Sequence, residues 1–130
     1  MYLRKLYHLT LLTTVITLCG GVVKAQTLSD EQISNYAQAV MQIESNRQRA
    51  YAEIQQIMGE NPPDIVCNQP SSYNALPEDA AQVAITYCQT SESIVKDTGM
   101  TAEQFNQITQ QVRQDQELEQ KLLDVMRNLQ

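Results

Sequence analysis

The chain has 130 residues, a formal net charge of −6 and 18% charged residues. This acidic balance works against binding to nucleic acid and to anionic lipid head groups, which carry the same sign of charge. With no Trp, one Phe and one His in the whole chain, the aromatic share of a core is small and histidine-based sites have a single candidate.

The first 25 residues have the composition of a cleavable signal peptide. Arg4 and Lys5 stand near the start, an apolar, threonine-rich run covers residues 9–18, and Ala25 precedes a polar stretch. This order is typical of export with cleavage after Ala25. One alternative is a retained membrane anchor, but the run is shorter than the roughly 20 residues that a spanning helix needs. A second is lipid attachment at Cys19, where Leu18 occupies the position that requires a small residue.

Residues 26–130 would then form the mature protein, a single helical domain. Cleavage removes His8 with the leader and leaves six basic and fifteen acidic residues, a net charge of −9. We therefore expect no nucleic-acid binding and no stable membrane insertion after cleavage.

Two phrases of the mature chain predict helix starts. Ser29 is followed three residues later by Gln32, and Thr101 is followed by Gln104 at the same spacing. Both pairs fit a capping box, in which the hydroxyl accepts from a free backbone N–H and the Gln side chain reaches back to the cap. We expect helices from about residue 30 and about residue 101.

The first helix should cover residues 30–58. Its apolar positions recur every three or four residues and so form one stripe: Ile33, Tyr36, Val40, Ile43, Ala50, Ile54 and Ile57. Arg47 interrupts that stripe. Either its stem packs while the guanidinium reaches solvent or an acid of a neighbouring helix, or it is a buried arginine that binds an anion.

The next segment, residues 59–76, is predicted to be one long loop. Gly59 fits the left-handed residue that closes a helix, and the four prolines of the chain fall between Pro62 and Pro77. Pro77 suits a first helical turn, so a second long helix should cover residues 77–97.

Cys67 in the loop and Cys88 in the second long helix are the two cysteines of the mature chain. In an exported domain such a pair is most simply a disulfide, worth roughly 3 kcal/mol for a loop of about twenty residues. The alternatives are a redox pair, which usually has C-x-x-C spacing, and metal thiolates, which need about four ligands for zinc.

The last region carries two apolar stripes that are out of phase, so we expect helices over residues 101–114 and 116–129 with a break near Asp115, an available N-cap. The fold class is therefore all-α: a three- or four-helix antiparallel bundle with one long Pro-rich loop tied by a disulfide.

Several phrases of the mature chain, in this order, carry a family resemblance: LSDEQISNYAQAVMQIE, RQRAYAEIQQIMG, PDIVCNQP, YCQTSESIV and MTAEQFNQI. They resemble the bacterial family called domain of unknown function 4168. The resemblance implies an exported, helical, single-domain protein, met largely in photosynthetic bacteria such as cyanobacteria. Members often have Asp-Pro where this chain has Asp115-Gln116. The resemblance implies no activity and no site residues.

The mature chain offers little for catalysis, because no histidine remains and no glycine-rich loop cradles a phosphate. Lys96 and Lys121 lie beside acids, as surface pairs do, and the acids near Asp115 lack the spacing of a calcium loop. We expect no enzyme activity, no metal site and no cofactor.

Binding is the remaining class of function. Tyr73 is predicted to be the most exposed aromatic residue, on a loop held rigid by the disulfide, although it could also simply cover the end of the bundle. The first hypothesis is a non-catalytic module of the cell envelope, periplasmic or otherwise exported, that binds a protein partner or itself. The second is a small-ligand carrier with a pocket between helices near Arg47.

Overall fold

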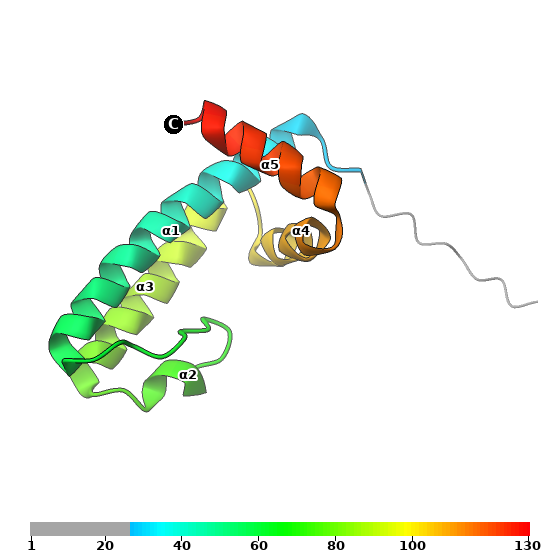
Figure 1. Ribbon diagram of the computed structural model, residues 1–130. Helices are drawn as coiled ribbons and strands as arrows, with labels where there is room; N and C mark the ends of the chain where they lie inside the picture. Colours follow the sequence, from blue (N-terminus) through cyan, green and yellow to red (C-terminus); the bar gives the residue numbers. More distant parts are fainter. Residues whose placement is uncertain (1–26) are drawn as a thin grey trace, which may run out of the picture.

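The computed structural model describes residues 27–130, and this part of the chain contains five α-helices and no strand (Figure 1). The helices are α1 (Asp30–Met58), α2 (Ser71–Asn74), α3 (Glu78–Asp97), α4 (Ala102–Gln114) and α5 (Gln116–Asn128). The all-α prediction is confirmed. The predicted signal peptide lies outside the described residues, and within residues 27–130 no helix combines the length and the apolar character required to span a bilayer.

Both predicted capping boxes are present. The Ser29 hydroxyl accepts from the Gln32 backbone N–H at 3.1 Å, and the Gln32 side chain accepts from the Ser29 N–H at 2.9 Å. Thr101 and Gln104 repeat the same two bonds at the start of α4. The likeness of the two phrases thus corresponds to the same local bonding at two helix starts.

Helices α1 and α3 form a long antiparallel hairpin, seen side by side in Figure 1. Small side chains line part of their seam: Ala80 and Ala84 are fully buried, and Ala50 is 6% exposed. Because these side chains end at Cβ, the two helix backbones can approach closely there.

Helices α4 and α5 both lie at the end of this hairpin where α1 begins and α3 ends. Helix α4, seen nearly end-on in Figure 1, contacts α3, and α5 packs across the first part of α1. The Pro-rich loop and α2 lie at the far end of the hairpin.

The break between α4 and α5 occurs at Asp115, as predicted. Its carboxylate accepts from the backbone N–H groups of Glu117 and Leu118 at 3.0 and 3.1 Å. Asp115 is therefore both the C-cap of α4 and the N-cap of α5, and its extended backbone turns the chain between them.

The core is divided into two groups of buried residues. The α4–α5 cluster contains Ile33, Tyr36, Ala37, Ala39, Val95, Met100, Ile108 and Leu122. The loop cluster contains Ala50, Ile54, Ile65, Tyr73, Ala80, Ala84 and Tyr87. Helices α1 and α3 contribute to both, so the hairpin is the element that joins the two ends of the molecule.

A disulfide joins Cys67 to Cys88, with 5.3 Å between the two Cα atoms, and this prediction is confirmed. Cys67 is exposed and Cys88 is half-buried on α3. The link attaches the middle of the loop to the middle of the hairpin. Helix α2 lies within this loop and was not predicted, because four residues are too few to show a helical repeat.

Replacing both Cys67 and Cys88 with Ala should lower the free energy of unfolding by about 3 kcal/mol, since the unfolded chain loses a constraint spanning about twenty residues. Urea denaturation followed by circular dichroism measures this change. Dithiothreitol should destabilise the wild type by a similar amount and leave the variant unaffected; a variant as stable as the oxidised wild type would contradict the expectation.

Candidate functional site

A groove of about 570 Å³ lies over α3, on the side of the hairpin that carries both the loop and α4. We call it the α3 groove. Its lining residues are Ile43, Cys67, Asn68, Tyr73, Ile85, Tyr87, Cys88, Gln89, Ser91, Glu92, Val95, Ala102, Phe105 and Asn106. Helix α3 forms the floor, the disulfide-bonded loop forms one wall, and the start of α4 forms the other.

The loop wall is held by the disulfide and by a small set of hydrogen bonds. The Ile65 N–H donates to the Tyr51 hydroxyl of α1 at 2.9 Å. Within the loop, the Val66 N–H donates to the Ser72 hydroxyl at 2.9 Å, and that hydroxyl donates to the Val66 carbonyl at 3.2 Å. Because side-chain oxygens satisfy the N–H groups of Ile65 and Val66, this part of the wall can keep one shape without a regular secondary structure.

The α4 wall is positioned by contacts with α1. The hydroxyls of Tyr36 and Thr109 are hydrogen-bonded at 2.9 Å, and the rings of Tyr36 and Phe105 lie 4.9 Å apart between centroids. These contacts fix the face of α4 that carries Phe105 and Asn106, so both walls are anchored to the same helix, α1.

Tyr73 is not the exposed aromatic residue that the sequence suggested. Its side chain is only 8% exposed and belongs to the loop cluster with Ile65, Ala84 and Tyr87. The one-turn helix α2, which begins after Pro70, carries the ring inward. The alternative reading, that Tyr73 covers the end of the bundle, describes its position; its small remaining accessible surface borders the α3 groove.

Arg47 has a partner that the sequence interpretation did not name. Its guanidinium donates two hydrogen bonds of 2.7 Å to the carboxylate of Glu44, on its own helix rather than on a neighbouring one. Its carbon Cζ also lies 5.0 Å from the centroid of the Tyr51 ring. The side chain is 41% exposed, so the interpretation as a buried anion-binding arginine is wrong.

This ion pair changes the acidity of both groups. The hydrogen bonds from Arg47, followed by one from Gln48, lower the pKa of Glu44 to about 2. The same hydrogen bonds to Glu44 stabilise the charged guanidinium and raise the pKa of Arg47 above its ordinary value. Because Glu44 already neutralises Arg47, this position is a poor choice for binding a further anion.

The groove itself offers amides, hydroxyls and apolar surface rather than reactive groups. Burial raises the pKa of the Tyr87 phenol, which therefore stays neutral at physiological pH. Glu92, the one charged lining residue, is paired with Lys96 at 2.7 Å, and the hydrogen bond from Lys96 lowers its pKa. Within residues 27–130 no three His, Cys, Asp or Glu side chains gather closely enough to hold a metal ion.

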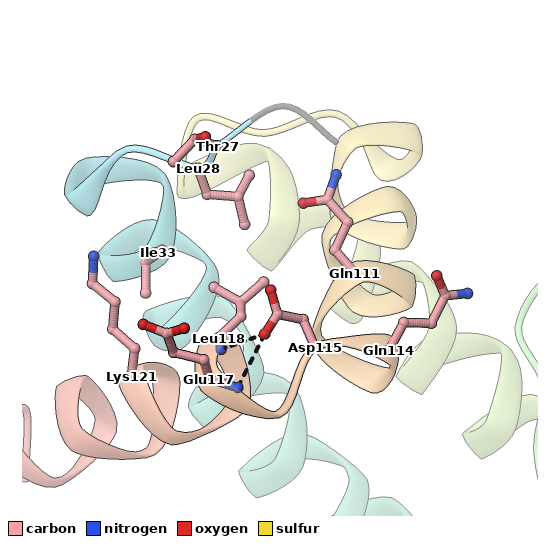
Figure 2. Close-up of a pocket in the computed structure, with 9 residues that line it drawn as sticks. All are labelled: Thr27, Leu28, Ile33, Gln111, Gln114, Asp115, Glu117, Leu118 and Lys121. Atoms are coloured by element: carbon pink, nitrogen blue, oxygen red, sulfur yellow. Dashed lines mark hydrogen bonds between the residues drawn. The ribbon is translucent and has the colours of Figure 1, made fainter. Parts of the chain in front are cut away.

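A second hollow, of about 460 Å³, lies where the start of the described chain meets the α4–α5 corner (Figure 2). Leu28 and Leu118 face this space. Two of its three charged side chains serve the fold: the Asp115 carboxylate caps α5, and Lys121 donates to Asp30 at 2.7 Å, which lowers the pKa of Asp30. The third is Glu117. Because Asp115 and Lys121 are engaged already, the α3 groove is the better candidate for binding.

Three residues singled out in the sequence border the groove, Cys67, Tyr73 and Cys88, whereas most of its other lining residues were missed. The sequence around α3 gives Gln89, Ser91 and Glu92 the pattern of an ordinary solvated helix face. Their neighbours in sequence do not indicate that the loop and α4 lie on either side of them. The only available signal was the predicted disulfide itself, which implied that the loop lies against the middle of α3.

A family model described as Domain of unknown function (DUF4168) matches residues 29–122. The chain belongs to this family. The match runs from the first capping box into α5 and includes both cysteines of the disulfide and the lining of the α3 groove. No curated protein and no solved structure matches the chain.

The DUF4168 description names no activity, so the role of the groove has to follow from its geometry. In that geometry the Tyr51 hydroxyl is the side-chain acceptor that connects the loop wall to α1. Replacing Tyr51 with Phe should leave the partly buried Ile65 N–H without its partner, at a cost of about 1–2 kcal/mol. Hydrogen exchange at the Ile65 amide should become faster, and urea denaturation should show the loss of stability.

Tyr36→Phe is the matched control, because it removes a hydroxyl whose bond lies at the α4 wall instead. It should leave exchange at Ile65 unchanged. Equal acceleration in both variants would contradict a local role for Tyr51 in the loop wall.

The Glu44–Arg47 pair should contribute to stability in a defined pH range. The pKa of Glu44 is about 2 in the folded protein against an ordinary value of 4.5, so its contribution is present above pH 4.5 and is lost as the pH falls toward 2. Because both side chains are well exposed, Glu44→Gln should lower the free energy of unfolding at neutral pH by only about 0.5 kcal/mol.

Urea denaturation of the wild type and Glu44→Gln at a series of pH values measures this difference, which should shrink below pH 4.5. In an Arg47→Gln background the same Glu44 substitution should have a much smaller effect. A difference that stays constant between neutral and acidic pH would contradict the assignment.

Proposed function

We propose that this DUF4168 protein is a non-catalytic interaction module of the bacterial cell envelope and that it binds a protein partner in the α3 groove. The observation that carries the proposal is the construction of the groove: two walls, contributed by segments remote in sequence, are fixed over a common floor by a disulfide and by contacts with α1. A concave surface of fixed shape, lined by apolar groups with amides at its edge, suits recognition.

Export is supported by two features. The first 25 residues have the order of a signal peptide. In addition, Cys67 is exposed and Cys88 is half-buried, so the reductants of a cytoplasm would reach the disulfide. An envelope compartment keeps this link oxidised, and the loop wall depends on the link.

A non-catalytic role is supported by the chemistry of the lining. Phenols, amides and a serine hydroxyl bind by hydrogen bonds, and the one carboxylate among them is held ionised by Lys96. A general acid or base would need a group whose pKa is brought toward neutrality. Neither Glu92 nor Tyr87 is shifted in that direction.

The second hypothesis, a small-ligand carrier centred on Arg47, receives less support. The guanidinium would have to give up two short hydrogen bonds to Glu44 before it could bind an anionic ligand. A protein partner that covers the groove requires no such exchange.

Photo-cross-linking in an envelope fraction of the native host tests the proposal. A benzoyl-phenylalanine at Gln89, an exposed residue of the groove floor, should give a discrete adduct with a second protein, identifiable by mass spectrometry. The same group at Ala52, exposed and half a turn from Ile43 around α1, is the control and should not. Recovery of only the unmodified monomer from the Gln89 probe would argue against the proposal.

A further inference from the structure

We propose that the α3 groove takes a single amphipathic α-helix whose edges carry Lys or Arg. This inference rests on the proposed function, because it assumes that the groove is the partner site, and it goes further by naming the class of partner. Four properties of the groove favour this occupant: the spacing of its walls, the hydrogen bonds its backbone already makes, its apolar lining and the negative charge of the protein.

The spacing of the walls matches one helix. The α3 residues that line the groove run from Ile85 to Val95. The loop wall is bonded to Cys88, and Val95, near α4, lies seven residues further along the helix. At about 1.5 Å per residue, these seven steps correspond to about 10 Å, and an α-helix with its side chains has a diameter of about 10–12 Å. A helix lying across the hairpin, alongside α4, would therefore contact both walls and the floor together.

The backbone of the groove favours a helix over an extended peptide. An extended segment adds to a sheet edge through a row of free N–H and C=O groups. Here the floor and one wall are helical, and the loop wall uses the N–H groups of Ile65, Val66 and Gln69 for its own bonds. A helix satisfies its backbone internally and needs only side-chain contacts.

The lining provides the complement to an amphipathic helix. Apolar side chains of three different helices, Ile43, Val95 and Phe105, lie in the groove, where an apolar stripe can pack against them. Two exposed amides, Asn68 on the loop wall and Asn106 on the α4 wall, lie at opposite sides. They can bond to polar groups at the two edges of the bound helix.

The charge of the protein favours a cationic partner. Residues 27–130 contain six basic and fifteen acidic residues, and four of the six basic side chains are engaged in ion pairs within the chain. Glu92, the charged residue of the lining, is already paired with Lys96. The attraction for a cation therefore comes from the overall excess of acids and from Glu103, one residue from Ala102 of the α4 wall. A second copy of this chain would bring the same excess of acids, so repulsion disfavours self-association.

Three synthetic peptides of about 18 residues, long enough to form helix, test the proposal. The first carries a leucine stripe with lysines at both edges, the second has glutamates in place of the lysines, and the third is a scramble of the first that disperses the leucines. Fluorescence anisotropy with the oxidised protein should show binding of the first peptide. The second and third should bind at least about tenfold more weakly, and added salt should weaken the first.

Two substitutions in the groove locate the binding. Ala102→Trp fills space beside the α4 wall and should lower the affinity for the lysine peptide at least about tenfold; Ala52→Trp is the same change at an exposed position of α1 outside the groove and should leave it unchanged. Asn106→Lys should also weaken binding through charge repulsion, whereas Gln120→Lys on α5 should not. Circular dichroism confirms that each variant is folded.

The acids can be tested in the same way. Glu92→Gln combined with Glu103→Gln should weaken binding of the lysine peptide several-fold, because both remove negative charge near the groove. Glu31→Gln combined with Glu119→Gln makes the same change of net charge away from the groove lining and should have a smaller effect.

The outcomes separate this inference from the proposed function. Equal binding of the lysine peptide and its scramble, or wild-type affinity in Ala102→Trp, would overturn the helix proposal. If the Gln89 probe gives an adduct in the envelope fraction while none of the three peptides binds, the groove is a partner site and the partner is not a cationic helix. If the peptides fail and the probe gives no adduct, both proposals are wrong.

Discussion

The disulfide between Cys67 and Cys88 is the constraint on which the groove depends. The loop from Gly59 to Leu76 is rich in proline and contains only one turn of helix, so regular secondary structure does little to position it. The covalent link attaches it to the middle of α3, where the Tyr51 hydroxyl and the packing of Tyr73 then become effective. Without that attachment the loop wall would depend on the Tyr51 hydrogen bond and on the packing of Ile65 and Tyr73.

Ionic interactions contribute little to this arrangement. Three of the four ion pairs in the described part of the chain join residues three or four apart on one helix, such as Glu44 with Arg47. Only Lys121 and Asp30 connect two elements, and both side chains are exposed. Exposed pairs of this kind are worth less than about 1 kcal/mol. The tertiary structure is therefore maintained by apolar packing, the disulfide and a few hydrogen bonds between elements, and the excess of acids sets the surface charge.

Features determined by neighbouring residues could be predicted from the sequence. The two capping boxes and the break at Asp115 depend on contacts within three residues, and the helices begin where those contacts predict. The partner of Arg47 was also within reach, because Glu44 lies three residues earlier, a spacing that places side chains next to each other on a helix.

Features that depend on the approach of distant segments were not predictable in this way. Whether Tyr73 faces water is decided by α2, a turn too short to show a pattern, and by the position of the loop against Tyr87. The same holds for the groove, since Gln89 and Ser91 become a floor only because the loop and α4 lie on the same side of α3. Local sequence specifies the helices, and their relative placement creates the binding surface.

The division of the core into two clusters has a consequence for any occupant of the groove. Tyr73 and Tyr87 belong to the loop cluster, whereas Val95 and Phe105 belong to or pack against the α4–α5 cluster, and all four border the groove. Separate clusters in one domain can open as separate cooperative units. A bound helix that contacts both clusters would couple them across their junction, so that the two ends of the protein unfold together.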